Sequence, residues 1–233
     1  MSRPQPEPRV SAIVVAAGRG ERFGAADKVL APLAGRPLLL HVLAAVDAAT
    51  TVQDVVLVVG EHTRAAVERL LAGEARRKPV RVVIGGARRQ DSVELGLCAT
   101  APEVAIVAVH DAGRPLVPAT LVDRCVAAAL ECGAAIAAVP VTDTIKRAAA
   151  GLVRQTVPRH DLWAAQTPQA FRRDLLLDAF ASPLARTTTF TDEAGLIEAL
   201  GLPVAIVTGD HRNFKITRPE DLVIAEALLA SAP

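Results

Sequence analysis

The chain has 233 residues, 26 of them Lys or Arg and 25 Asp or Glu, which gives a formal net charge of +1. This even balance excludes the broad positive field that proteins use to bind DNA or RNA, and 51% hydrophobic residues against 22% charged ones exclude an intrinsically disordered chain. No apolar run reaches the roughly 18 residues of a membrane-spanning helix. The three cysteines form no CxxC pair and residues 1–9 lack the layout of a signal peptide, so we expect a cytoplasmic protein without a disulfide framework or zinc site.

Short β-branched segments alternate along the chain with Ala- and Leu-rich segments of helical periodicity. After a Pro-rich tail, residues 1–9, which we expect to be disordered, strands are predicted at residues 10–15, 54–59, 80–84, 104–109, 134–139 and 204–207. Helices are predicted at residues 38–48, 63–71, 92–101, 118–131, 172–181, 191–200 and 217–229, and Asp91 with Glu94 has the spacing of a capping box at the start of the third helix. This alternation is typical of an α/β domain, here residues 10–230, with a doubly wound, mostly parallel sheet that binds its ligands at the carboxyl ends of the strands.

One stretch, residues 141–163, interrupts the alternation. It is polar and β-prone on both sides of a turn at residues 148–151, so we predict a β-arm that protrudes from the domain. Because a two-stranded hairpin is only marginally stable by itself in water, we expect the arm to pack on a second subunit and form a homodimer.

The first predicted strand runs into a glycine-rich segment, Ala16-Ala17-Gly18-x-Gly20-x-Arg22, and Lys28 follows it. Glycines let the backbone approach a polyphosphate closely, and consecutive free N–H groups form an anion-binding nest. The spacing GxGxxxG matches neither the dinucleotide-binding GxGxxG nor a Walker loop, which leaves a tight strand-to-helix turn as the structural alternative. The cations of Arg22 and Lys28 beside the loop favour a nucleoside triphosphate.

Two further strands lead into polar loops. Gly85 and Gly86 follow the third strand and permit close approach of a flat group such as a base, while the hydroxyl of Ser92 either reads a base edge or caps the next helix. Asp111 follows the fourth strand and suits a ribose hydroxyl, a phosphate-bound Mg²⁺ or a substrate, or else caps its own loop with help from Arg114. We expect the neighbouring His110 to be structural rather than a proton shuttle.

The remaining candidates lie in later loops, and they offer hydroxyls and cations suited to an acidic, hydroxylated small molecule. They are Thr144, Lys146, Arg159, Thr167, Thr191 and Lys215.

These motifs follow one another in a single order along residues 10–230. The glycine loop comes first, then GG…DSV at residues 85–93, HDAGRP at 110–115, DTIK at 143–146, TPQ at 167–169, TDE at 191–193 and NFKITRPED at 213–221. The ordered set resembles the 2-C-methyl-D-erythritol 4-phosphate cytidylyltransferase family of the nucleotidyltransferase superfamily. The resemblance implies a Rossmann-like nucleotidyltransferase fold and the transfer of CMP from CTP to 2-C-methyl-D-erythritol 4-phosphate with release of pyrophosphate, a step of isoprenoid precursor biosynthesis.

The resemblance also implies a role for each candidate residue. Arg22 and Lys28 would stabilise the transition state, while Lys215, together with Arg159 from the neighbouring subunit's arm, would position the attacking phosphate. The nucleotide contacts that it implies are Ala16, Ala17, Gly18, Gly20, Gly85, Gly86, Ser92, Asp111 and Ala112, and the substrate contacts are Asp111, Arg114, Thr144, Arg159, Thr167, Thr191 and Lys215. Mg²⁺ is expected to bind mainly through the phosphates of CTP.

The sequence departs from the family pattern at positions that bear on the metal. Ala87 replaces an acidic residue after the paired glycines, and Arg212 replaces an Asp before Asn213, so the protein ligands of Mg²⁺ stay unassigned. Two other functions stay open, a ribitol 5-phosphate cytidylyltransferase and a non-catalytic α/β module that binds nucleotide and dimerises through the arm. A short-chain oxidoreductase is disfavoured because it relies on a tyrosine and the chain has none.

Overall fold

A seven-stranded sheet forms the centre of the protein. The computed structural model describes residues 8–18, 23 and 27–231, so most of the tail predicted to be disordered lies outside the described residues. The strand order is β11-β7-β10-β6-β1-β4-β5, with bounds Ala205–Thr208, Ala134–Pro140, Trp163–Arg172, Ile106–Asp111, Val10–Ala16, Asp54–Val59 and Val80–Ile84. Every neighbouring pair is parallel except β10, which runs antiparallel to both β6 and β7. The predicted α/β class with a doubly wound, mostly parallel sheet is confirmed.

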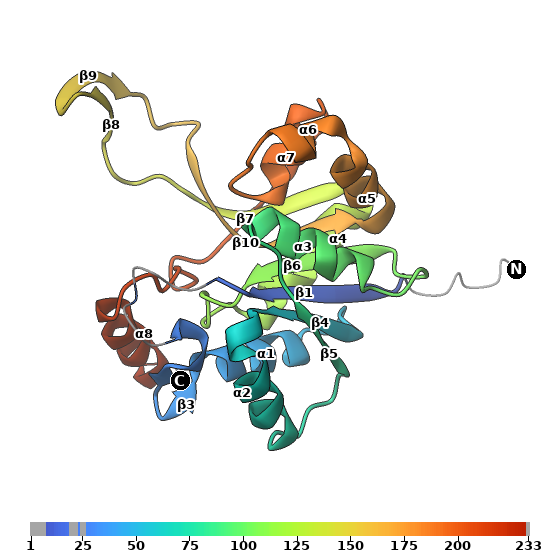
Figure 1. Ribbon diagram of the computed structural model, residues 1–233. Coiled ribbons are helices and arrows are strands. Elements are labelled where there is room, and N and C mark those ends of the chain that lie inside the picture. The colour runs from blue at the N-terminus through green and yellow to red at the C-terminus, as the bar shows by residue number, and fades with distance from the viewer. Residues whose placement is uncertain (1–7, 19–22, 24–26, 232–233) are drawn as a thin grey trace, which may run out of the picture.

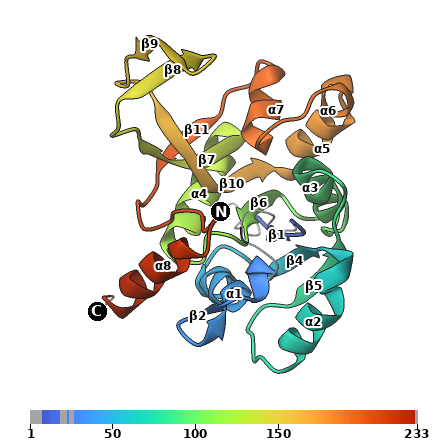
Figure 2. The same ribbon diagram turned by 60° about the vertical axis from the view of Figure 1, so that its left-hand side comes forward.

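Helices cover both faces of this sheet, as Figures 1 and 2 show. Successive side chains of β1 point to opposite faces, so Val14 packs with α1 (Leu38–Ala48), α2 (Glu61–Ala72) and α4 (Ala119–Cys132), whereas Ile13 packs with the second layer. That second layer contains α3 (Arg89–Cys98), α5 (Arg173–Ala181), α6 (Pro183–Thr187) and α7 (Glu193–Ala199). Burial on both faces explains why the strands are continuous apolar runs in the sequence.

The C-terminal helix α8 (Glu220–Ala230) lies beside a short hairpin of β2 (Pro32–Leu33) and β3 (Arg36–Pro37). Glu226 Oε1 accepts a hydrogen bond of 2.9 Å from the backbone N–H of Ala34 in the hairpin turn. Among the described residues, no helix has both the length and the apolar character that crossing a membrane requires.

The predicted arm is present and projects from the body of the protein (Figure 1). Its strands β8 (Ile145–Ala149) and β9 (Leu152–Val157) pair antiparallel around a turn at Ala150 and Gly151, both of which have positive φ. Leu152 and Val153 are 62% and 64% exposed. Exposed apolar side chains on an isolated hairpin are consistent with the prediction that another surface covers the arm.

The sequence does not predict strand β10, because only its first residue, Trp163, falls in the predicted arm, and residues 164–171 fall in a predicted loop. Its sequence contains a proline and several polar residues, which disfavour a central strand. The strand tolerates Pro168 because its pairing with β7 is irregular between Ala165 and Gln169, where no regular ladder bond is needed. The short helix α6 and the β2–β3 hairpin were also missed.

Two boundaries beside the candidate site differ from the prediction. Strand β6 runs to Asp111 rather than to residue 109, so His110 and Asp111 belong to the sheet and not to a loop. Helix α3 begins at Arg89 rather than at Ser92, which places Asp91 in its first turn instead of at the cap. The Asp91 carboxylate accepts a bond of 3.0 Å from the backbone N–H of Arg88, so it satisfies an N-terminal donor from inside the helix.

Candidate active site

A cavity of about 670 Å³, its open mouth included, lies at the carboxyl ends of the neighbouring strands β1 and β6. The loop after β5 and Lys215 from the segment before α8 complete its wall. The lining residues are Val15, Ala16, Ala17, Gly18, Lys28, Val29, Gly86, Ala87, Arg88, Arg89, Ser92, Asp111, Ala112, Gly113 and Lys215. This is the edge of the sheet at which the sequence predicted a ligand site.

The glycine loop reaches this cavity through its first residues. Ala16, Ala17 and Gly18 line the cavity together with Lys28, whereas Gly20 and Arg22 lie outside the described residues. Lys28 begins a short 3₁₀-helix (Lys28–Leu30), and its Nζ donates a hydrogen bond of 2.9 Å to the carbonyl oxygen of Ile216. Gly18 and Lys28 therefore line the same cavity, in keeping with the expectation that Lys28 lies beside the glycine loop.

A glycine lies across the cavity from the Lys28 ammonium group. A Cβ atom at position 113 would lie 2.9 Å from Lys28 Nζ, closer than such contacts occur in proteins. Gly113, in the loop after β6, therefore leaves room for the ammonium group beside the ends of β1 and β6.

The paired glycines after β5 allow three segments to meet. A Cβ at Gly85 would lie 2.4 Å from Ala17 Cβ and 2.7 Å from Ser92 Oγ, and a Cβ at Gly86 would lie 2.5 Å from Asp91 Cβ. Gly86 donates its N–H to Ser92 Oγ at 3.1 Å, and that hydroxyl lies 3.2 Å from the carbonyl oxygen of Arg88. Ser92 thus closes the loop onto α3 and lines the cavity at the same time.

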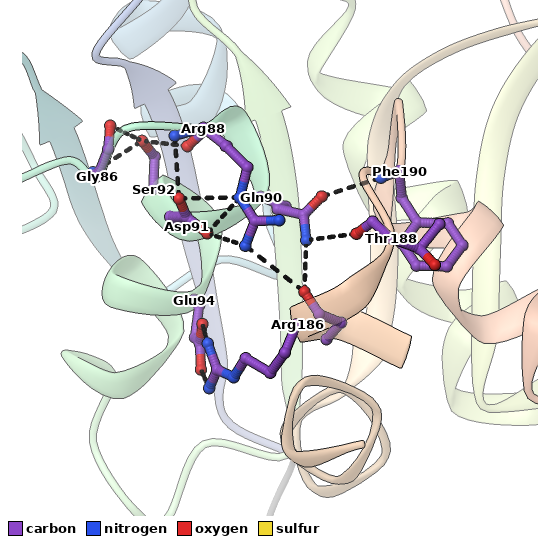
Figure 3. A network of polar contacts seen from close by, with 10 residues as sticks. Gly86, Arg88, Gln90, Asp91, Ser92, Glu94, Arg186, Thr188 and Phe190 are labelled. Atoms are coloured by element: carbon purple, nitrogen blue, oxygen red, sulfur yellow. Dashed lines mark hydrogen bonds and ion pairs between the residues drawn. The ribbon is translucent and has the colours of Figure 1, made fainter. Parts of the chain in front are cut away.

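A network of polar contacts fixes the start of α3 against α6 and the segment after it (Figure 3). The Gln90 amide donates to the carbonyl oxygens of Ala185 and Thr188 at 2.9 and 3.2 Å, and its oxygen accepts from the N–H of Phe190 at 2.9 Å. On the outer side Arg186 pairs with Glu94 at 2.6 Å. The first turn of α3 is therefore tied to a segment about 100 residues later in the chain.

The Asp111 carboxylate stands between two cations. Its Oδ1 accepts from Arg89 Nε at 3.0 Å, and its Oδ2 accepts from Lys215 Nζ at 2.6 Å. Burial alone would raise the pKa of Asp111, but the charges of Arg89 and Lys215 hold it well below its ordinary value. Asp111 is therefore ionised at neutral pH and fixes the direction of both cationic side chains.

A hydrogen-bonded chain behind Asp111 holds this end of β6 in place. The Asp111 N–H donates to Thr167 Oγ1 at 3.0 Å, and the Thr167 hydroxyl lies 3.0 Å from His110 Nδ1. His110 Nε2 is 3.1 Å from the carbonyl oxygen of Arg114, so the neutral ring donates there and accepts from Thr167. Burial lowers the pKa of His110 to about 4. The expectation that His110 is structural agrees with this geometry, and Thr167 lies behind the cavity rather than in its lining.

Other predicted residues lie beside the cavity or away from it. Arg114 donates to the carbonyl oxygens of Asn213 and Ala165 at 2.8 and 3.3 Å, and burial lowers its pKa. Thr144 and Arg159 belong to the arm, outside the cavity of their own chain, and Thr191 is exposed just before α7.

Arg89 and Glu193 carry no predicted role, although Glu193 belongs to the TDE motif. Both groups are at the site, since Arg89 lines the cavity and donates through Nη1 to the Glu193 oxygens at 2.8 and 3.0 Å. Their place in the sequence could have indicated a role, because Arg89 lies within the segment 85–93 and Glu193 within the TDE motif, and both segments support the family resemblance.

The charge of the lining suits a polyanion. Among the described residues that line the cavity, Lys28, Arg88, Arg89 and Lys215 are cationic, and Asp111 is the one carboxylate. Within the described part of the chain no three His, Cys, Asp or Glu side chains group as metal ligands. A Mg²⁺ ion fits such a lining when the phosphates of a bound nucleotide supply most of its oxygen ligands.

Comparison with known proteins identifies relatives over almost the whole length. The family profile described as 2-C-methyl-D-erythritol 4-phosphate cytidylyltransferase matches residues 10–231. The enzyme of that name from Pelotomaculum thermopropionicum is 47% identical over 95% of this chain and 94% of its own, and the one from Geobacillus kaustophilus is 45% identical over 94% and 96%.

Solved structures show the same likeness. The crystal structure of 2-C-methyl-D-erythritol 4-phosphate cytidylyltransferase from Thermus thermophilus has a TM-score of 0.77 at 35% identity and covers 95% of this chain and 99% of its own. That of 4-diphosphocytidyl-2C-methyl-D-erythritol synthase from Anaerococcus prevotii has a TM-score of 0.85 at 29% identity and covers 96% and 99%. The residues that the family profile matches, 10–231, span every strand of the sheet and every described residue that lines the cavity.

Proposed function

The chain belongs to the 2-C-methyl-D-erythritol 4-phosphate cytidylyltransferase family, and we propose that it transfers CMP from CTP to 2-C-methyl-D-erythritol 4-phosphate. In this reaction a phosphate oxygen of the polyol phosphate bonds to the α-phosphorus of CTP. The bond from that phosphorus to the β-phosphate bridging oxygen breaks, and pyrophosphate leaves.

The observation that carries the proposal is the cluster of cations around one cavity at the carboxyl ends of β1 and β6. Two polyanions repel each other, and the displacement adds negative charge at the reacting phosphorus, so the protein must supply fixed positive charge and alignment rather than a nucleophile. Lys28 and Lys215 enter the cavity from different segments and can contact two different phosphate groups. Arg22 joins Lys28 in stabilising the transition state.

The remaining residues bind and orient the two substrates. The end of β1 and the loop after β5 bind the nucleotide, and Gly85, Gly86 and Ser92 contact its cytosine base. Asp111 would bind the sugar or polyol hydroxyls from the lining and Arg114 from beside the cavity, and Thr167 holds Asp111 from behind. Thr144 and Thr191 complete the substrate contacts from outside the lining of the isolated chain.

Mg²⁺ is the proposed cofactor, bound mainly through the triphosphate oxygens of CTP. When bound, it neutralises phosphate charge and helps to align the leaving pyrophosphate. The lining supports this arrangement because the cations outnumber the single carboxylate among its described residues.

The active unit of the proposal is a homodimer of single-domain subunits, residues 10–230, joined through the arm, residues 141–163. The arm carries Arg159 away from the cavity of its own chain, so Arg159 would position the polyol phosphate in the partner's site. Exposed Leu152 and Val153 on the arm support burial against a second subunit. The proposed compartment is the cytoplasm, in keeping with three unpaired cysteines.

A pyrophosphate-release assay tests the proposal. The purified protein with Mg²⁺ is given CTP, UTP, ATP or GTP, each with 2-C-methyl-D-erythritol 4-phosphate or ribitol 5-phosphate. We expect rapid release only with CTP and the methylerythritol phosphate. Faster turnover with ribitol 5-phosphate would assign the alternative substrate, and CTP binding without any release would indicate a non-catalytic nucleotide-binding module.

A further inference from the structure

The start of α7 places a buried carboxyl group against Arg89, a residue of the cavity lining. Glu193 is the first residue of α7, its side chain is 1% exposed, and both its oxygens accept from Arg89 Nη1, at 2.8 and 3.0 Å. Burial raises the pKa of Glu193, and the adjacent guanidinium opposes that rise. Arg89 is thus held by two buried carboxyl groups, Asp111 at Nε and Nη2 and Glu193 at Nη1.

The position of Glu193 is set by the sheet itself. Gln169 on β10 donates to Asp192 Oδ2 at 2.8 Å, and its side-chain oxygen accepts from the N–H of Ala194 at 3.3 Å. Asp192 caps α7 by accepting from the N–H of Gly195 at 3.0 Å. Because β10 pairs with β6, the strand that ends at Asp111, the first turn of α7 is fixed relative to Asp111.

Through Asp111, Arg89 is also connected to Lys215, the lysine proposed to bind the phosphate of the polyol substrate. Arg89 Nε and Nη2 both lie 3.0 Å from Asp111 Oδ1, and Asp111 Oδ2 holds Lys215 Nζ at 2.6 Å. An ammonium group has three donors, so Lys215 can keep its bond to Asp111 and still donate to a phosphate. The direction of Lys215 therefore depends on the direction of the Asp111 carboxylate, which Arg89 sets.

We propose that Arg89 and Glu193 are positioning residues, which orient Lys215 toward the phosphate of the polyol substrate through the carboxylate of Asp111. The inference rests on the proposed function and extends it to Arg89 and Glu193, to which that proposal assigns no individual role. Buried ion pairs of this kind contribute little net stability compared with an apolar pair, because removing both charges from water is costly. What the pair does supply is orientation, since guanidinium and carboxylate meet in a fixed geometry.

The charge-neutral double variant Arg89→Gln/Glu193→Gln separates orientation from folding and from net charge. It leaves neither an unpaired buried ion nor a change in total charge, while Asp111 loses its contact with the guanidinium. The matched control is Glu94→Gln/Arg186→Gln, which removes an ion pair between α3 and α6 without touching Asp111. Each protein is characterised by its melting temperature and by steady-state kinetics with both substrates varied.

We expect the double variant to raise the KM for 2-C-methyl-D-erythritol 4-phosphate by about tenfold and to lower kcat by about 10–100-fold, as for a misplaced binding group. The KM for CTP should change by less than about threefold, and the control should match the wild type. Unchanged constants, or equal increases of both KM values, would overturn the inference.

A second variant and a binding measurement keep the test decisive if the double variant fails to fold. Arg89→Lys keeps a cation beside Asp111 but loses the planar fork, so it should show the same selective rise in KM, to a smaller degree. Calorimetric titration with the polyol phosphate measures the loss of affinity without turnover. If the wild type binds the polyol phosphate but releases no pyrophosphate with it, the proposed function fails, whereas equal affinity of wild type and Arg89→Lys refutes the positioning role alone.

Discussion

We expect the free energy of unfolding to fall as the pH decreases from about 6.5 toward 4, because His110 is buried in its neutral form. Burial lowers the pKa of His110 from 6.5 to about 4, even though the adjacent Arg114 carbonyl and Asp111 favour the charged ring. Between these two values the unfolded chain binds a proton that the folded protein does not, so stability is present above pH 6.5 and is lost below it. At 1.36 kcal/mol per pH unit the full loss is about 3 kcal/mol, of which about 2 kcal/mol falls between pH 6.5 and 5.

The assay is urea denaturation of the wild type and of His110→Gln at several pH values from 5 to 7.5. Glutamine can still donate to the Arg114 carbonyl oxygen but does not titrate, so the variant should lack the pH dependence that the histidine contributes. Most carboxylates protonate at lower pH, and Asp111 is held ionised by Arg89 and Lys215, so the difference between the two proteins isolates the histidine. If the free energy of unfolding changed equally with pH in the two proteins across this range, the reasoning would be refuted.

Four further predictions concern the cavity and the arm. Lys28→Ala should lower turnover by about 10²–10³-fold with an unchanged melting temperature, and a near-normal rate would remove Lys28 from the mechanism. Gly85→Ala should destabilise the protein by about 1–3 kcal/mol in urea, because its Cβ would lie 2.4 Å from Ala17 Cβ. Chelation of divalent cations should abolish pyrophosphate release and leave the melting temperature unchanged, and a large drop would reveal a structural metal. Mixing inactive Lys28→Ala and Arg159→Ala subunits should restore about a quarter of wild-type activity, since about half of the dimers carry one intact site; no recovery would contradict an arm that serves the partner's site.

Local patterns were sufficient to predict most of the sheet. The predicted ranges of β4 and β5 agree with the structure, and β1 extends one residue further. The three strands are mostly apolar, and β4 and β5 are each followed directly by a glycine. The carboxyl ends of parallel strands meet at one edge of the sheet, which is why the end of β1 and Lys28 could be expected at a ligand site, whereas Lys215 was expected there only from the family resemblance.

Element boundaries at the site were less predictable. Helix α3 begins three residues earlier than the capping pattern suggested, because Asp91 satisfies the Arg88 N–H from the first turn, and Gln90 is anchored by Ala185, Thr188 and Phe190. Those anchors lie about 100 residues away in the chain, and no local pattern contains them.

The sequence by itself determined the fold class, the order of the motifs and the positive character of the site, because periodicity, glycine spacing and charge are local properties of the chain. Only the tertiary structure decided which charged groups meet. Glu193 and Arg89 are 104 residues apart, as are Lys215 and Asp111, and they come together because β10 enters the sheet beside β6 and fixes the start of α7. The polar residues of β10 look like a loop in sequence, and they are buried because the fold supplies each with a distant partner, such as Asp192 for Gln169.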